Sequence, residues 1–289
     1  MKVNDFIEFN KKRDLGAMVS DTYKFLREEW NPFFKTILKI SLVPILLVIT
    51  SIIFFISSFS DFFSTILSFY KLGDFELPDT NYGIFFIMAM IFLISYLTAY
   101  IMITASAMYY VKSYAENNGK IDYYYVKQMT FNKFWSFVAI YAMTGIMVLV
   151  GLLFCILPGL YFGIVLSLSS CLLVFSKKSA IDAIGDSFIF IKGHWWDTFG
   201  ILLVTGLIVS VLNYITQIPA TIYQLLQFGT SIFNLSDPSQ MIILFEDPIY
   251  LLLLSFSYVI QLFFYSITLV VTMFVYFDIK DQRNIAVSH

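Results

Sequence analysis

The apolar run "TILKISLVPILLVITSIIFFISSFS", from Thr36 to Ser60, contains a single ionisable residue, Lys39. A helix needs about 20 apolar residues to cross a hydrocarbon core about 30 Å thick. The run therefore predicts a membrane-spanning helix. Lys39 lies close enough to one end for its ammonium group to extend back to the membrane surface.

The composition of all 289 residues points to the same class of protein. Hydrophobic residues make up 59% of the chain and charged residues 13%, and the mean hydropathy is +0.79. These values lie far outside the averages of soluble proteins. Apolar runs of spanning length lie near 36–60, 83–110, 134–156, 158–176, 198–227 and 248–277. The sequence thus predicts an all-α polytopic protein, one membrane domain over 1–289 with six transmembrane helices.

The third and fourth spans are separated only by "LPGLYFG", from Leu157 to Gly163. Pro158 followed by Gly159 is a strong turn signal, so we expect a tight hairpin there. Cys155 and Cys171 would then differ in depth by roughly 15 Å at a helical rise of about 1.5 Å per residue. A disulfide joins Cα atoms only about 4.4–6.8 Å apart, so we expect free thiols.

The distribution of basic residues predicts the orientation. If the N-terminus is cytoplasmic, the loops 61–82, 157–158 and 228–247 lie outside and contain one of the 18 Lys and Arg residues, Lys71. Because basic residues stay on the cytoplasmic side of short loops, we expect both termini in the cytoplasm. The first 35 residues lack the apolar core of a cleavable signal peptide, so the first span is expected to direct insertion. The net charge of −2 gives no basic excess for binding nucleic acid.

A segment before the first span recurs before the fifth. "SDTYKFLREEWNPFF" (20–34) and "GDSFIFIKGHWWDTF" (185–199) align at an offset of 165 residues. Identical residues occupy four aligned pairs: Asp21/Asp186, Phe25/Phe190, Trp30/Trp195 and Phe34/Phe199. Each segment has an apolar face and a charged face at helical spacing. We predict cytoplasmic interfacial helices at 14–30 and 179–195, related as a parallel repeat, with Asp21 and Asp186 as an equivalent polar pair.

Aromatic residues end each predicted interfacial helix. Trp30, Trp195 and Trp196 are expected at the level of the lipid headgroups, where the apolar ring and the N–H group are both accommodated. His194 lies beside them, and we favour its interpretation as a polar residue in a wet interface over a contact with lipid phosphate. A weaker third copy runs from Gly119 to Trp135.

Three stretches carry a resemblance to a known family: "RDLGAMVSDTYKFLREEWNPFFKTILKI" (13–40), "LPGLYFGIVLSLSSCLLVFSKKSAIDAIGDSFIFIKGHWWDTFGILLV" (157–204) and "VVTMFVYFDIKDQRN" (270–284). The chain resembles bacterial multi-pass membrane proteins related to the membrane domain of glycerophosphoryl diester phosphodiesterases. The resemblance covers nearly the whole chain and implies a six-helix inner-membrane protein. It implies no phosphodiesterase activity, because the catalytic barrel of those enzymes has no counterpart in this sequence.

Residues for catalysis or metal binding are scarce. The sequence has two histidines, His194 and His289, and contains no HExxH, CxxC, Walker or GxSxG motif. We therefore predict no catalytic residues, no metal site and no cofactor.

Two helices carry polar seams. The predicted fifth and sixth spans hold polar side chains at helical spacings, namely Asn213, Gln217 and Gln224, and Tyr258, Gln261 and Tyr265. Hydrogen bonding between helices is one reading, worth about 0.6 kcal/mol per contact on average. We favour this reading, and a substrate path is the alternative, which Pro219 keeps open because it interrupts the fifth span.

The last outer loop contains two Asp-Pro pairs. Asp237-Pro238 and Asp247-Pro248 each place an N-cap residue before a proline suited to a first helical turn. We predict a short outer helix between them, followed by the sixth span.

Together these features predict a non-enzymatic integral membrane protein that serves as a scaffold or accessory subunit of a membrane complex. Membrane lipids are the expected partners, with a membrane protein or a second copy of the chain as further possible partners. The alternative is a transporter or lipid-handling protein that uses the seam between the fifth and sixth spans.

Overall fold

A computed structural model describes residues 7–9, 11, 13–72, 82–176, 178–229 and 239–287. These ranges are mainly helical and contain no strand. Six helical stretches are long and apolar enough to cross a membrane: Gly16–Ile66, Gly83–Glu116, Phe134–Phe154, Ile156–Phe175, Trp195–Gln227 and Pro248–Arg283. The prediction of an all-α polytopic membrane protein is confirmed.

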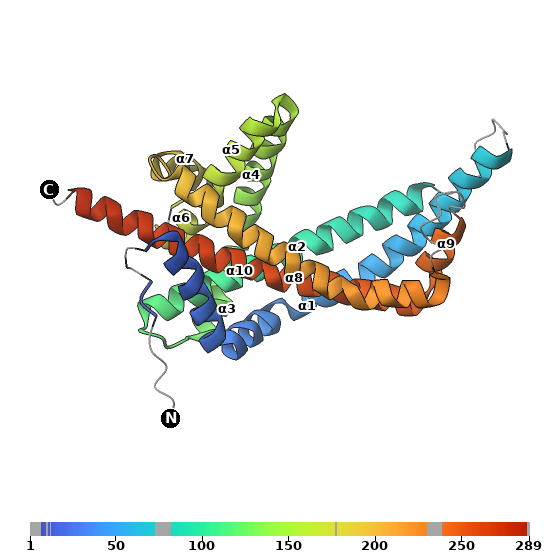
Figure 1. The fold of residues 1–289 in the computed structure, drawn as a ribbon, viewed down its shortest axis with the longest axis horizontal. Coiled ribbons are helices and arrows are strands. Elements are labelled where there is room, and N and C mark those ends of the chain that lie inside the picture. The colour runs from blue at the N-terminus through green and yellow to red at the C-terminus, as the bar shows by residue number, and fades with distance from the viewer. Residues whose placement is uncertain are drawn as a thin grey trace. The chain divides into compact units, whose positions relative to one another are not determined.

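The chain divides into two compact units. Unit 1 comprises 1–40, 101–210 and 263–289, and unit 2 comprises 41–100 and 211–262. Four long helices contribute residues to both units: α1 (Leu15–Leu72), α2 (Tyr82–Glu116), α8 (Trp195–Phe228) and α10 (Pro248–Val287). Figure 1 labels them. The prediction of a single membrane domain stays a prediction.

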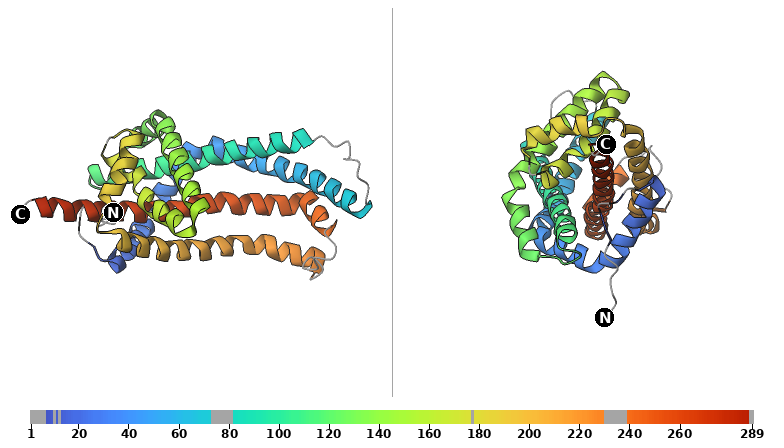
Figure 2. Two further views of the ribbon diagram at one scale, coloured as in Figure 1. Left: turned by 90° about the horizontal axis from the view of Figure 1, so that it is seen from above. Right: turned by 90° about the vertical axis from the view of Figure 1, so that its left-hand side faces the viewer.

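Unit 2 is a small helical bundle with an apolar core. Ile52 of α1 and Leu251 of α10 are buried together. The hydroxyl of Ser257 donates to the carbonyl of Thr216 over 2.8 Å and so joins α10 to α8, which run alongside each other in Figure 2. Such hydrogen bonds stabilise helix pairs in lipid because the unpaired polar group would otherwise face hydrocarbon.

The predicted outer helix is present as α9 (Ser239–Glu246). Asp247 then caps α10, since its Oδ1 accepts from the amides of Ile249 at 2.8 Å and Tyr250 at 3.1 Å. This bears out the capping prediction for Asp247-Pro248. Asp237-Pro238 lies outside the described residues.

Unit 1 also contains shorter helices that lie entirely within it. These are α3 (Tyr123–Asn132), α4 (Phe134–Phe154), α5 (Ile156–Ser167), α6 (Ser169–Phe175) and α7 (Ala180–Phe190). The helices of the repeat begin with polar caps. Asp14 accepts from the amide of Ala17 at 2.6 Å, and Ser179 accepts from the amide of Asp182 at 3.2 Å. Asp14 and Ser179 are 165 residues apart, so the cap recurs with the rest of the repeat.

The hairpin between α4 and α5 turns earlier than predicted. The break is at Cys155, whose backbone is extended, and Pro158 and Gly159 lie inside α5. Near a helix start proline loses no hydrogen bond, because the first amides are unpaired anyway. Gly159 has another use: a Cβ built on Gly151 would lie 2.9 Å from the Cα of Gly159, so the two glycines permit a close crossing. Both cysteines are free thiols, as predicted.

The two predicted interfacial helices differ in how they end. The helix predicted at 14–30 is not separate, because α1 continues without a break from Leu15 to Leu72. The second copy does end, since α7 stops at Phe190 and Gly193 adopts a φ of +87° before α8 begins. The residue aligned with Gly193 is Glu28, a good helix former, which explains the continuous first copy. Their position at a membrane surface stays a prediction.

Candidate interfacial and ligand-binding sites

Each copy of the repeat contains a basic–acidic clasp. Arg13 Nε lies 2.7 Å from Asp21 Oδ2, and the ammonium of Lys178 pairs with Asp186 Oδ2. In both copies the base precedes the acid by eight residues. Eight residues along one helix span about 12 Å, so the clasp forms only because the base lies in the segment before the helix.

The sequence analysis missed Arg13 and Lys178. The same offset of 165 residues relates them, and this was the available signal. Helical periodicity does not reveal the pairing, because neither base belongs to the helix that carries its acid.

The arginine of the first clasp is buried. Arg13 donates from Nη1 to the carbonyls of Phe9 and Lys11, each at 2.9 Å, and its guanidinium lies 4.8 Å from the ring centroid of Phe274. Its backbone amide donates to Asp278 Oδ1 over 2.7 Å. Phe274 and Asp278 belong to α10, so the first copy is held against the end of that helix.

The second copy also contacts α10, with the roles exchanged. Here α10 supplies the guanidinium: Arg283 donates to the carbonyl of Ile189 over 2.6 Å and lies 5.4 Å from the ring centroid of Phe190. Phe190 in turn stacks on Tyr276 with centroids 5.1 Å apart. Both copies thus combine an arginine, an aromatic ring and α10.

The predicted aromatic anchors have unequal exposure. Trp30 is 52% exposed and packs on Phe34 at 4.4 Å, whereas Trp195 stacks on Phe199 at 5.4 Å. Trp196 is 76% exposed. Trp196 rather than Trp195 therefore presents an open ring in the second copy.

His194 has a structural contact through its backbone. Its carbonyl accepts from the amide and hydroxyl of Thr198 at 3.0 and 2.8 Å, in the first turn of α8. Within the described ranges its imidazole forms no hydrogen bond or ion pair with another side chain. The reading of His194 as a polar residue in a wet interface stays a prediction, and its contact with lipid phosphate stays the alternative.

A buried carboxylate near the first anchor was not predicted. Glu29 is buried and its Oε2 accepts from the hydroxyl of Tyr110 over 2.6 Å. The position equivalent to Glu29 in the second copy is His194, so this contact belongs to the first copy alone. Such a charged hydrogen bond is stronger than a neutral one.

The residues of the predicted polar seam lie in different surroundings. On α8, Gln217 is exposed, while Asn213 and Gln224 are half-buried. Tyr258 and Gln261 line a groove of about 300 Å³ in unit 2, formed with Tyr96 of α2 and apolar residues of α1 and α2. The structure therefore brings the α10 seam together with α1 and α2 rather than with Gln217. The sixth seam residue, Tyr265, belongs to unit 1 and is half-buried.

Near the outer helix, polar groups are hydrogen-bonded to one another. The hydroxyl of Tyr223 donates to Asp247 Oδ2 over 2.8 Å. This bond, with the amides of Tyr250 and Ile249, lowers the pKa of the Asp247 carboxyl below its ordinary value. The arrangement fixes the start of α10.

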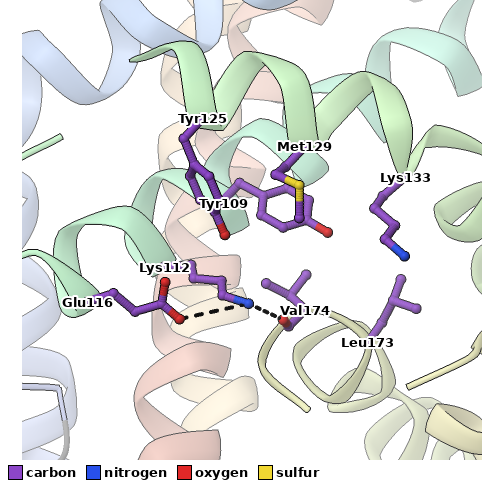
Figure 3. A pocket seen from close by; sticks show the side chains of 8 residues that line it. All are labelled: Tyr109, Lys112, Glu116, Tyr125, Met129, Lys133, Leu173 and Val174. Carbon is purple, nitrogen blue, oxygen red and sulfur yellow. Dashed lines mark hydrogen bonds and ion pairs between the residues drawn. The ribbon is translucent and has the colours of Figure 1, made fainter. Parts of the chain in front are cut away.

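A second pocket, of about 450 Å³, lies in unit 1 between α2, α3 and α6. Figure 3 shows its lining side chains, which are Tyr109, Lys112, Glu116, Tyr125, Met129, Lys133, Leu173 and Val174. The Lys112 ammonium donates to the carbonyl of Val174 over 2.7 Å and lies 3.9 Å from Glu116. Burial, and after it the charge of Glu116, raises the pKa of Tyr125. The sequence signal for this pocket was the spacing of residues 109, 112 and 116, which places them on one helix face.

Within the described ranges, no three His, Cys, Asp or Glu residues are placed to bind one metal ion. Comparison with family models, with curated proteins and with solved structures finds no match for the chain.

Proposed function

We propose that the protein is a non-enzymatic scaffold of a bacterial inner-membrane complex, with both termini in the cytoplasm. The proposal rests on the buried charged side chains, each of which is paired within the protein. The Arg, Lys, Asp and Glu side chains that are buried in the described part of unit 1 each have a partner inside that unit, and they are Arg13, Glu29, Lys112 and Asp278.

Buried charges of this kind hold helices in a fixed arrangement. A buried charge is costly unless it is paired, and breaking such a pair costs about 3–5 kcal/mol. In a transporter we would expect ionisable groups to face a substrate path. Here they fasten the first copy of the repeat to α2 and α10 and join α2 to α6, which supports an architectural role.

The repeated helices also offer surfaces for partners. Each copy exposes at least one large aromatic ring, and these are Tyr23 and Trp30, Tyr124 and Trp135, and Trp196. Rings with a polar edge suit both lipid headgroups and protein contacts. The placement in an inner membrane rests on the resemblance to membrane proteins related to glycerophosphoryl diester phosphodiesterases, which stays part of the proposal.

Photocrosslinking in native membranes tests the scaffold. A photoreactive phenylalanine at Trp196 and, separately, at Tyr124 should give a discrete protein adduct, identified by mass spectrometry as another protein or a second copy. The control is Leu149 of α4, an exposed residue inside a predicted span, which should give lipid adducts. Lipid adducts alone at all three positions would contradict the scaffold.

A second candidate function rests on the groove of unit 2. Its hydroxyl and amide groups, from Tyr96, Tyr258 and Gln261, lie among apolar side chains and suit an amphiphile. In proteoliposomes, transbilayer movement of a fluorescent phospholipid should then be faster with the wild-type protein than with Gln261→Leu. Gln217→Leu is the matched control, because Gln217 does not line the groove. Faster movement that only Gln261→Leu abolishes would replace the scaffold by a lipid-handling function.

A further inference from the structure

A tyrosine hydroxyl opens into the pocket of unit 1. Tyr109 is 2% exposed, its ring packs against Phe137 and Tyr125, and its hydroxyl faces the pocket in Figure 3. That hydroxyl makes no hydrogen bond to another described residue and is not fully enclosed, so it is open to the pocket. A few polar groups that open into a pocket are what orients a bound ligand.

The pocket combines positive charge with further donors. Lys133 directs its ammonium toward the same space in Figure 3 and forms no ion pair within the described ranges. Lys112 adds a second ammonium, held in place by the carbonyl of Val174, and Glu116 supplies one carboxylate. Two cations against one anion leave the lining with an excess of one positive charge.

These groups match the acceptors of a phosphate. A phosphate group offers several oxygens that accept hydrogen bonds, and bonds from ammonium groups to such oxygens are short and strong. Hydrogen bonds to these oxygens can come from Lys133, Tyr109 and Tyr125. The positive charge of Lys112 attracts the negatively charged phosphate. The volume of about 450 Å³ lies in the range of about 300–1,000 Å³ typical of ligand sites.

The pocket lies next to a predicted membrane surface. Lys133 directly precedes α4, which is apolar enough to span, and the ring of Trp135 in its first turn is exposed. Exposed tryptophan at the start of a span is typical of the headgroup level. A phosphate at this position would therefore be within reach of the lipid headgroups.

We propose that this pocket binds a phosphate group, carried either by a phospholipid headgroup or by a small free phosphate ester. Lys133 and Tyr109 bind the phosphate oxygens directly. Tyr125 contributes a second hydroxyl, and Glu116 restricts access of ligands with a larger negative charge.

The test uses the full chain, purified in detergent and studied by native mass spectrometry with dioleoylphosphatidylglycerol. Dioleoylglycerol has the same chains without the phosphate. The variants are Lys133→Gln, which removes the charge, and Tyr109→Phe, which keeps the ring packing. Lys127→Gln is the matched control, because Lys127 is an exposed lysine of α3 that does not line the pocket.

We expect Lys133→Gln to weaken binding of the phospholipid about 10-fold, and Tyr109→Phe about 3-fold, with Lys127→Gln unchanged. Dioleoylglycerol should bind much less than the phospholipid. Displacement of the lipid by millimolar glycerol 3-phosphate would identify a free ester as the ligand, and failure to displace it would identify the headgroup.

Two results would overturn the proposal. One is equal binding of the two lipids. The other is an equal loss with Lys127→Gln and Lys133→Gln, which would show attraction by surface charge in general. If Lys133→Gln does not fold, Tyr109→Phe decides: wild-type affinity in that variant overturns the site.

Discussion

Residues 13–34 and residues 178–199 use equivalent side chains in unequal surroundings. Both copies have a capped helix start, a basic–acidic clasp and an aromatic pair four residues apart. The first clasp contains a buried arginine, whereas the side chain of Lys178 is 45% exposed. A repeated sequence thus preserves contacts, while the contribution of each contact to stability changes with its burial.

The largest expected effect separates the two clasps. Arg13→Met removes the donor for several backbone carbonyls and the cation over Phe274, so we expect a loss of about 3 kcal/mol in the free energy of unfolding. We take the lower end of the range of energies for breaking a buried ion pair, because the Asp21 side chain is 33% exposed. Lys178→Met should cost at most about 1 kcal/mol, since exposed pairs are screened.

Unfolding of both variants by sodium dodecyl sulfate in mixed micelles, followed by circular dichroism, measures this difference. Equal losses for Arg13→Met and Lys178→Met would show that burial does not set the weight of the clasp.

The second-largest expected loss in the free energy of unfolding concerns the contact of Glu29 with Tyr110. Tyr110→Phe leaves the buried carboxylate without its hydroxyl donor, which should cost about 2 kcal/mol. The change at the equivalent position of the second copy, His194→Gln, should cost less than about 0.5 kcal/mol, as do most substitutions away from buried contacts. The same unfolding titration compares them, and a larger loss for His194→Gln would assign that imidazole a contact that the structure lacks.

The smallest effect concerns the end of α7. Gly193 has a φ of +87°, so Gly193→Ala should cost about 1 kcal/mol although its Cβ would meet open space. Gly193→Asn should cost less, because asparagine tolerates this conformation. Differential scanning fluorimetry in detergent ranks the variants. Equal melting temperatures for alanine and asparagine would mean that the helix break does not depend on glycine.

The sequence predicted the fold class because long apolar runs have few other uses. The turn between the third and fourth spans was predicted at Pro158-Gly159, but it lies at Cys155. The prediction was wrong because proline is also accepted in the first turn of a helix, and glycine also occurs where two helices cross closely. The clasps escaped prediction because their bases lie outside the helices. The phosphate pocket joins α2 to α3 and α6, and no local pattern in one helix reveals such a combination.

We propose that the two copies of the repeat are equivalent helices at one membrane surface. Spin labels at Lys24→Cys and Ile189→Cys, which are aligned and both exposed, test it in a background of Cys155→Ala and Cys171→Ala. Collision rates with oxygen and with a water-soluble nickel complex, measured in liposomes, report the depth of each label. We predict depths that agree within about 5 Å at the same surface, as for helices lying in the interface. Labels at opposite surfaces, or one label at the bilayer centre, would contradict the account.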